Sequence, residues 1–589
     1  MEKSSGRGSS CWSVTVLKCN ISLPYIVCLL IKLWLILPCS LSSQLYEKST
    51  HFLLELIQNA DDNTYDCPRP TLSFSYKPGS LRIDCNEVGF SAENVEAICA
   101  ISRSTKSGKT SDGEYIGEKG IGFKSVFKAA DVVWISSRDF TFKFDKTKFL
   151  GMVAPVWEAF PEPTQPGCTS IYLQLSKGYE EDTLIHELLT FDTNLLIFLR
   201  RVEEINIRVN RRDEQVWEKK IRKDESQQGA DRLTVLYANE EISRYLIRTH
   251  IIKDLPKELK RPNWPQTKIL LAFPITEPQK PLPLTPQNVY AFLPIRNYGL
   301  KGDFLLTASR EDIESTLPWN RTIRDALADA FLLSIDHFNQ GQLRYVWPYY
   351  LPSASTATCS FLEPAITSIL AKLRESDVLE SCAETMVKAS SLKHVPLDPF
   401  VDGEGVPFTL NTHTAAGYLS LKYPAWAIEA TSSIGVSQLS PREFLGDLHS
   451  AIKRDPTTFR TKSATWHSQL AQTLVKISTD VELISLIQDI CLIPLHDGNW
   501  SSAKGQSLFF SKSKTSLEVP SGIEVLIVDS IAESDPHRCR LFTNLGVKAW
   551  EAPEICRLVL KVHDSSDFDP NRPDHLPCCI SLQSFMAAS

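Results

Sequence analysis

The sequence predicts a mixed α+β protein built from several domains. Helical and strand patterns follow one another irregularly over about the first 210 residues, which favours α+β over a doubly wound parallel sheet. A length of 589 residues is too great for one hydrophobic core. The composition, 43% hydrophobic and 23% charged, is that of an ordinary folded protein. We therefore expect helices packed over a mixed sheet, then a further α/β domain, and finally a helix-rich C-terminal region.

Changes of pattern along the chain predict five segments. They are an uncertain N-terminal segment at 1–42, a first α/β domain at 43–210, a second at 211–345, a helix-rich α/β region at 346–570 and a disordered tail at 571–589. No short-period repeat is visible in the sequence.

In the first domain, apolar residues at helical spacing predict a helix over residues 42–63. Alternation and turn residues then predict two short strands joined by KPGS, followed by a helix opened by Ser91. The expected elements in order are strands 71–76 and 80–85, helix 91–101, a helix running into a strand over 123–137, and strands 140–145 and 169–175.

In the second domain we expect strands at KILLAFPI, VYAFLPI and DFLLTAS, closed by one long helix over residues 320–340. Farther on, the apolar runs in DICLIPLHDGNW and IEVLIVDS predict short strands. His496 and Asp497 in LHDGNW invite a catalytic interpretation, but an Asp-Gly-Asn turn between two strands explains them more simply.

The apolar run YIVCLLIKLWLIL at residues 25–37 has three interpretations. Thirteen residues are too few for a membrane span of about 20 residues, but they fit a signal-peptide core. The run is also compatible with a buried helix or strand. A third interpretation, which we favour, is that the segment is foreign to the fold, because a packed helix follows it without a linker.

Charge and cysteine usage limit the function classes. A net charge of −7 provides no basic field for wrapping nucleic acid, so no nucleic-acid partner is expected. The fifteen cysteines include no CxxC pair, which argues against a zinc ribbon or a disulfide framework. We expect an intracellular protein of the cytoplasm or nucleus, with secretory or membrane targeting left open by residues 25–37.

Three polar residues share one face of the predicted helix at 42–63. Glu55, Asn59 and Asp62 lie at i, i+4 and i+7. A solvated polar face would explain them. A magnesium site would also explain them, because Mg²⁺ takes hard oxygen ligands such as an Asn carbonyl while keeping water and phosphate ligands.

A glycine-rich segment, GEYIGEKGIGFKSVF, precedes the next predicted helix. Its glycines, at 113, 117, 120 and 122, would let backbone N–H groups cradle an anion at a helix N-terminus. A flexible surface loop is the simpler alternative. The nearby SGKT is not a P-loop, because Arg103 occupies the position of the first glycine.

Taken in order, ELIQNADDN, IDCNEVGFS and GEYIGEKGIGFKSVF resemble the three nucleotide-binding boxes of the GHKL ATPase superfamily, which has the Bergerat fold. The wording of HFLLELIQNADDN, NEVGF, STKSG and GEKGIGFKSVF resembles most the sacsin and NO VEIN type of eukaryotic proteins. The resemblance is strong over about residues 43–210 and looser to about residue 345.

The resemblance implies roles for particular residues. Glu55 would be the general base, Asn59 would hold Mg²⁺, and Asp62 would line the ribose and adenine side. Thr169 would support the adenine-binding carboxylate through water. The phosphate-binding lid would comprise Gly117, Lys119, Gly120, Gly122 and Phe123.

Two of the implied roles rest on altered or weaker motifs. The second box departs from DxGxG, so either Glu87 with Gly89 or Asp84 in a shifted register would accept the adenine amino hydrogen. In SREDI, Arg310 matches an arginine that reaches the γ-phosphate in the related chaperones. A surface charge cluster explains Arg310 equally well.

The resemblance implies ATP and Mg²⁺ as cofactors, ATP and ADP as ligands, unknown protein clients, and a dimer as a possibility. We expect slow ATP hydrolysis that gates a chaperone-like or scaffold protein. The alternative is a pseudo-ATPase interaction scaffold, favoured by the altered second box. Histidine kinase activity is disfavoured because no His-bearing dimerisation helix precedes the first box.

Overall fold

The computed structural model describes residues 51–99, 122–211, 215–228, 231–259, 261, 264–276, 289–291, 293–296, 300–306, 313–352, 360–511, 525–550, 554, 557–558, 560–561 and 564. The chain divides into two compact units, one of residues 1–334 with 353–368 and one of residues 335–352 with 369–589. The domain boundaries expected from the sequence remain predictions. The mixed α+β class and the helix-rich C-terminal region are confirmed.

One fourteen-stranded sheet forms the centre of the first unit, in the order β13-β12-β14-β11-β10-β9-β8-β7-β1-β2-β6-β3-β4-β5. The strands are β1 Thr71–Lys77, β2 Ser80–Cys85, β3 Ala130–Ser137, β4 Phe140–Asp145, β5 Val156–Trp157, β6 Thr169–Leu175, β7 Glu204–Asn210, β8 Val216–Gln228, β9 Asp231–Ala238, β10 Glu241–Lys253, β11 Gln266–Ile275, β12 Val289–Ala291, β13 Leu293–Arg296 and β14 Leu300–Lys301. Among the described residues up to 338, the helices are α2 Phe52–Asp61, α3 Ala92–Cys99, the 3-10 helix η1 Gly122–Lys128, α4 Glu181–Leu189, α5 Leu195–Phe198, α6 Pro318–Asp325 and α7 Leu327–Phe338.

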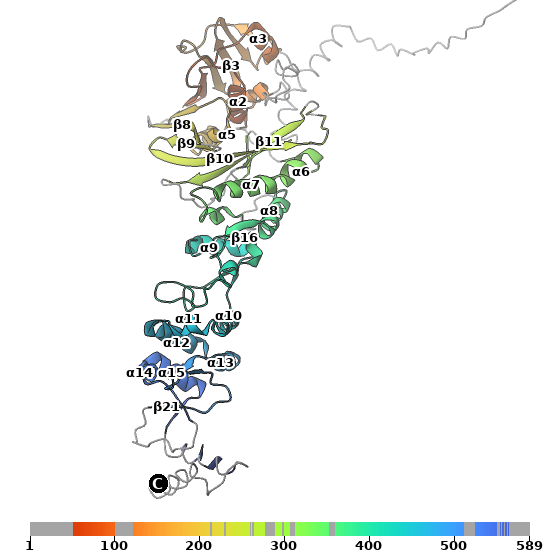
Figure 1. The fold of residues 1–589 in the computed structure, drawn as a ribbon. Coiled ribbons are helices and arrows are strands. Elements are labelled where there is room, and N and C mark those ends of the chain that lie inside the picture. Colours follow the sequence, from red (N-terminus) through yellow and green to blue (C-terminus); the bar gives the residue numbers. More distant parts are fainter. Residues whose placement is uncertain are drawn as a thin grey trace, which may run out of the picture. The chain divides into compact units, whose positions relative to one another are not determined.

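The sheet continues without a break past residue 210. β1 pairs antiparallel with β2 and parallel with β7, and β7 pairs antiparallel with β8. The long strands β8, β9, β10 and β11 then continue the sheet side by side (Figure 1). The predicted boundary between the first and second domains therefore falls inside one hydrogen-bonded sheet.

Alternate side chains along the strands form the hydrophobic core on one face of this sheet. Leu72 and Phe74 of β1 are buried, and their partners Cys85 and Ile83 in β2 are buried with them. These side chains join one apolar core with the apolar face of α2, whose Leu56 and Ile57 are almost fully buried. The predicted strands 71–76, 80–85, 140–145 and 169–175 are confirmed.

Four expected elements differ from the structure. VYAFLPI, expected as one strand, forms the two antiparallel strands β12 and β13. The helix expected after residue 122 is the 3-10 helix η1, and the long helix over 320–340 is divided at Ala326 into α6 and α7. The strand expected at 303–309 is absent over the described residues 303–305. There, Asn320 bonds the backbone N–H and C=O of Leu305, and the Trp319 indole donates to Asp303 O. Among the described residues, the backbone pairing there is limited to Glu314 N, which donates to Leu305 O, and one antiparallel bridge between Leu306 and Ile313.

The remaining elements, from residue 347 onward, are mostly short. The helices are η2 Trp347–Tyr350, α8 Glu363–Glu375, η4 Ala389–Ser391, η5 Ala415–Gly417, α9 Ala425–Thr431, η6 Ser432–Ile434, α10 Pro441–Arg454, α11 Pro456–Arg460, α12 Ala464–Ile477, α13 Val481–Gln488, α14 Ser530–Ser534 and α15 Pro536–Leu545. The strands are β15 Asp377–Glu380, β16 Met386–Lys388, β17 Lys393–His394, β18 Ser437–Gln438, β19 Ile493–Pro494, β20 Trp500–Ser501, β21 Leu508–Phe510, β22 Leu526–Ile527 and β23 Lys548–Ala549.

The second unit contains the same strand arrangement twice, in a first module at 377–438 and a second module at 493–549. In each module, an isolated bridge connects an antiparallel hairpin (β15–β16 or β19–β20) to a second segment (residues 418–419 or β22). That segment lies parallel to a third strand (β17 or β21), and the third strand pairs in parallel with the last strand (β18 or β23). The bridges that connect the parts are Ser381 to Leu419 and Lys393 to Tyr418 in the first module, and Leu495 to Val528 in the second.

Individual backbone hydrogen bonds recur in the same places. Cys382 N donates to Tyr418 O in the first module, as His496 N donates to Ile527 O in the second. Leu419 N donates to Lys393 O, as Val528 N donates to Phe509 O. The long-period repeat is thus evident from topology and hydrogen bonding.

In each module, a glycine with left-handed backbone conformation and then a valine directly precede the last strand. Gly435 has φ +104° after η6, and Gly546 has φ +100° after α15. The valine N–H then bonds back to the preceding turn, from Val436 to Thr431 O and from Val547 to Phe542 O. Only glycine adopts this conformation without strain.

None of the helices in the described part of the chain combines the length and the apolar content that crossing a bilayer requires. The apolar run at 25–37 lies outside the described residues.

Because both modules contain this glycine turn, we expect an alanine substitution of the glycine to destabilise the protein in each module. We expect Gly546→Ala to destabilise the second unit by about 1–2 kcal/mol, because the added Cβ has open space but the backbone is strained. Gly435→Ala should cost at least as much, since its Cβ would lie 3.2 Å from Arg374 Nε. Gly446→Ala, inside α10 with open space, is the control and should stabilise slightly. Amide hydrogen exchange across α9, α10 and α15 would measure these effects. Equal exchange in all three variants would contradict the assignment.

Candidate functional site

The polar stripe of α2 is largely removed from solvent. Glu55 is 4% exposed and Asp62, which follows the last helical residue, is 2% exposed, whereas Asn59 between them is partly exposed. A solvated polar face, the simpler of the two interpretations of this stripe, is therefore wrong for Glu55 and Asp62. A buried carboxylate requires specific partners, because desolvation of a charge is costly.

The end of the glycine-rich segment lies directly against Glu55. A Cβ added at Gly122 would clash with Oε2 of the Glu55 carboxylate. Gly122 starts η1, and Ser125 Oγ donates to Gly122 O at 2.6 Å, which fixes this first turn. The first and third motifs thus come together in the structure, with a glycine where the carboxylate needs room.

The two aspartates at the end of α2 hold a distant turn. Asp61 is fully buried, and its carboxylate accepts the backbone N–H groups of Arg200, Arg201 and Val202 at 2.8–3.1 Å. The Arg200 guanidinium forms an ion pair with Asp62 at 2.5 Å. Asp62 therefore faces Arg200, and its predicted role at the ribose stays a prediction.

Asp61 and Arg200 were not among the residues selected from the sequence. The adjacent acids in NADDN and the arginine pair in FLRRV were visible signals, but nothing in the sequence paired them across 138 residues.

The two candidate adenine carboxylates lie in different surroundings. Asp84 points to the side of β2 opposite the α2 core, where it forms an ion pair with Arg82 at 2.8 Å and accepts the Ser170 hydroxyl at 2.5 Å. Burial acts to lower the pKa of Arg82, but Asp84 and then Glu162 raise it overall. Asp84 is thus held by groups of the sheet itself.

Glu87 lies beside the C-terminal end of α2 instead. It is 7% exposed, and the next residue, Val88, donates its N–H to Thr64 O just beyond α2. The Tyr65 hydroxyl donates to Ala60 O and lies 3.2 Å from Cys85 Sγ. Burial, then Cys85, then the charge of Glu87 raise the pKa of Tyr65.

Thr169 is joined to the second motif by a chain of hydrogen bonds. Thr169 lies opposite Cys85 in the β2–β6 register, so it faces the α2 core. Its hydroxyl is 2.6 Å from that of Ser137, and Ser137 Oγ accepts the Phe90 N–H at 2.8 Å. Gly89, at φ +86°, packs on the Arg138 side chain, whose Nε donates to Val88 O. Ser137, also missed in the sequence, thereby positions the loop that carries Glu87 and Gly89.

A buried lysine follows the glycine motif. Lys124 is 7% exposed, and its Nζ donates to Met152 O and lies 4.4 Å from the centre of the Phe144 ring. Burial lowers the pKa of Lys124 to about 8, against a smaller opposing effect of Cys99. Phe123, by contrast, is partly exposed next to Gly122.

Four selected residues lie outside the described residues, so the structure does not test them: Gly117, Lys119, Gly120 and Arg310. The described residues of the predicted site are Glu55, Asn59, Asp62, Asp84, Glu87, Gly89, Gly122, Phe123 and Thr169. Among these, the structure brings Gly122 to Glu55, places the loop of Glu87 beside the end of α2, and places Thr169 on the α2 side of the sheet.

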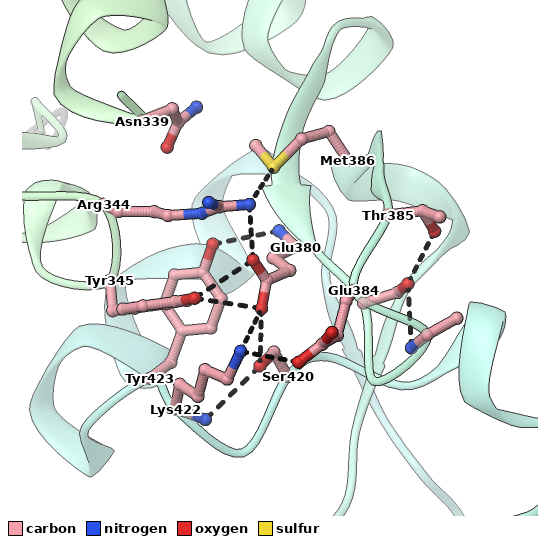
Figure 2. A network of polar contacts seen from close by, with 12 residues as sticks. Asn339, Arg344, Tyr345, Glu380, Glu384, Thr385, Met386, Ser420, Lys422 and Tyr423 are labelled. Atoms are coloured by element: carbon pink, nitrogen blue, oxygen red, sulfur yellow. Dashed lines mark hydrogen bonds and ion pairs between the residues drawn. The ribbon is translucent and has the colours of Figure 1, made fainter. Parts of the chain in front are cut away.

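The second unit contains a separate buried acid, Glu380, at the end of β15 (Figure 2). Its carboxylate pairs with Arg344 at 2.5 Å and Lys422 at 3.2 Å, and accepts the Tyr345 hydroxyl. Glu384 and then Glu380 raise the pKa of Lys422. The Ser420 hydroxyl also donates to Glu380, at 3.3 Å. Because two cations and two hydroxyls satisfy this acid, we interpret the network as structural. At the equivalent position the second module has Pro494.

His496 and Asp497 form the turn between β19 and β20. Asp497 Oδ1 accepts the Asn499 N–H at 2.9 Å, and Gly498 has φ +83°. The predicted Asp-Gly-Asn turn is confirmed.

Comparison with known proteins finds no family model that matches the chain. The chain is similar to "Protein NO VEIN" of Arabidopsis thaliana, with 28% identity over 538 aligned residues that cover 81% of this chain. The alignment covers 19% of the Arabidopsis protein, so the chain spans about a fifth of the length of that relative.

Because the Asp61 carboxylate accepts three backbone N–H groups, we expect its removal to destabilise the first unit strongly. We expect Asp61→Ala to destabilise the first unit by roughly 3 kcal/mol, because three backbone N–H groups, that of Val202 buried, lose a charged acceptor. Asp66→Ala, which removes the same charge from an exposed position, is the matched control and should change stability by less than about 0.5 kcal/mol. Urea unfolding with hydrogen exchange at α2 and β7 would measure both variants. Equal stability of the two would show that the Asp61 contacts are unimportant.

Proposed function

We propose that the first unit binds ATP with Mg²⁺ and hydrolyses it slowly, as a GHKL-type module of a NO VEIN-like protein. The nucleotide state would control a chaperone-like or scaffold conformational cycle. The observation that carries the proposal is the contact of Gly122 with the Glu55 carboxylate. It joins the acid-bearing helix to a glycine-rich segment, the combination that phosphate binding and water activation need.

The residues of α2 would divide the chemistry between them. Glu55, held in a largely buried site, would accept a proton from the attacking water, and its carboxylate is close enough to the glycine segment to act at a phosphate there. The partly exposed Asn59 side chain, one helical turn on, would supply an oxygen ligand to Mg²⁺. The bound Mg²⁺ would neutralise phosphate charge during transfer.

The second motif would recognise the base. Glu87 is favoured as the acceptor of the adenine amino hydrogen, because Asp84 is held by Arg82 and Ser170 on the other side of β2. Thr169 and Ser137 would fix the loop around Glu87 and Gly89 through Phe90 N–H. The proposal keeps Gly117, Lys119, Gly120 and Phe123 as phosphate-lid residues, Asp62 at the ribose side and Arg310 as a γ-phosphate contact.

An interaction scaffold with little or no hydrolysis is the second candidate. It is favoured by the engagement of Asp62 with Arg200 and of Asp84 with Arg82, which removes two acids from nucleotide recognition.

Measurements on Glu55→Ala separate the two candidates. We expect Mg²⁺-dependent ATP binding by the intact chain, which survives Glu55→Ala, while phosphate release falls at least 100-fold because the general base is lost. Glu96→Ala, an exposed acid on α3, is the control and should retain both. Equilibrium dialysis and a phosphate-release assay provide the readouts. Binding without turnover in the wild type would support the scaffold, and no ATP binding at all would refute nucleotide recognition.

The two carboxylates of the second motif can be tested against each other. Glu87→Gln should weaken ATP binding at least tenfold, because the charged acceptor of the adenine amino group is lost. Asp84→Asn should leave ATP affinity within about twofold while it lowers thermal stability, because Asp84 pairs with Arg82. If instead Asp84→Asn abolishes binding and Glu87→Gln does not, the assignment must be reversed.

A further inference from the structure

A polar pocket of about 520 Å³ lies beside the first module of the second unit. It is formed by β17, the segment around residues 411–418 and α10. Its chemistry-bearing lining residues are Lys393, His413, Tyr418, Asp447, Ser450 and Arg454. The volume is within the range of about 300–1,000 Å³ usual for small-ligand sites.

The acids in and beside this pocket already accept hydrogen bonds. Asp447 accepts the Tyr418 hydroxyl at 2.6 Å. Glu443, on the same helix, pairs with Lys393 at 2.8 Å and accepts the Ser440 N–H. Lys393, followed by Ser440, lowers the pKa of Glu443 to about 2, so Glu443 is ionised at neutral pH.

The hydrogen-bond donors of the pocket have fewer partners than its acids. Within the described residues, the side chains of Arg454 and His413 have no hydrogen-bond or ion-pair partner, and both are exposed at the pocket. Lys393 uses its ammonium group on Glu443 and has further protons to donate. The pocket therefore offers the side-chain donors of Arg454, His413 and Lys393, with one carboxylate, that of Asp447, also in its lining. This excess of donors suits an anionic acceptor.

The second module serves as an internal comparison. Phe509 occupies the place of Lys393, since each accepts the equivalent backbone N–H, from Val528 and Leu419 respectively. Ile527 likewise occupies the place of Tyr418. Phe509 is 2% exposed and packs on Trp550. The module therefore folds with apolar residues at these two positions, so folding does not require the polar lining of the first module.

We propose that this pocket binds an anionic group, a phosphate or a carboxylate, carried by a small molecule or a peptide side chain. The planar Arg454 guanidinium can donate two parallel hydrogen bonds to such a group. His413 and Lys393 supply further donors, and the Ser450 hydroxyl also lines the site. The site belongs to the second unit and does not depend on nucleotide binding by the first.

The test is a calorimetric titration of the full chain with three probes: inorganic phosphate, O-phospho-L-serine and L-glutamate. We expect saturable binding of at least one probe. Arg454→Ala should weaken that binding at least tenfold, and His413→Gln should weaken it measurably. Lys453→Ala, the neighbouring exposed cation on α10 that does not line the pocket, is the matched control and should stay within about twofold of the wild type.

The probes also identify the ligand chemistry. Binding of both phosphorylated probes without glutamate supports a phosphate site, and binding of glutamate as well supports a general anion site. Because the first unit has its own proposed phosphate contacts, dependence on Arg454 is the deciding result. The proposal is overturned if none of the probes binds saturably, or if Arg454→Ala and His413→Gln bind like the wild type while thermal melting shows both to be folded.

Discussion

The buried carboxylate of Asp61 is the contact on which the arrangement of the first unit depends. By accepting three successive N–H groups at residues 200–202, it ties the end of α2 to the turn that leads into β7. β7 in turn runs parallel to β1, the strand under α2. A charged group with no exposure is tolerated because every donor around it is fixed backbone or the Arg200 guanidinium. Glu55 and Asn59 therefore sit on a helix whose end is held in place.

The same turn is also held from the other side. Lys223 of β8 is 4% exposed and donates to Leu199 O at 2.5 Å, one residue before the segment that Asp61 binds. Burial lowers the pKa of Lys223, against the raising effect of Glu225 and Asp61. The turn at 199–202 thus joins α2 to the long antiparallel strands β8–β11. A change at α2 would reach these strands through fixed hydrogen bonds, which gives the proposed nucleotide cycle a physical route into the rest of the sheet.

Local patterns predicted the elements near α2, whereas distant pairings could not be predicted. The strands at 71–76 and 80–85 followed from alternation and a clear turn, and the helix around Leu56 followed from apolar residues at helical spacing. The 13-residue strand β8 was not predicted, because its sequence VWEKKIRKDESQQ is charged throughout and its partners β7 and β9 supply the reason for its extended form. Over its described residues, the strand expected at 303–309 is reduced to one bridge between Leu306 and Ile313, because Asn320 bonds the backbone of Leu305. For the site, the structure brings together Glu55 and Gly122, which were both selected from the sequence, whereas Asp61 and Ser137 act through partners far away in the sequence.

The central claim is that the polar stripe of α2 faces a bound nucleotide and its metal ion. The most direct measurement is the ATP affinity of the intact chain with and without Mg²⁺, compared between the wild type and Asn59→Ala. We expect Mg²⁺ to strengthen ATP binding by the wild type, and most of this gain to be lost in Asn59→Ala because a metal ligand is removed. ATP binding that gains equally from Mg²⁺ in both proteins, or no ATP binding in either, would contradict the claim.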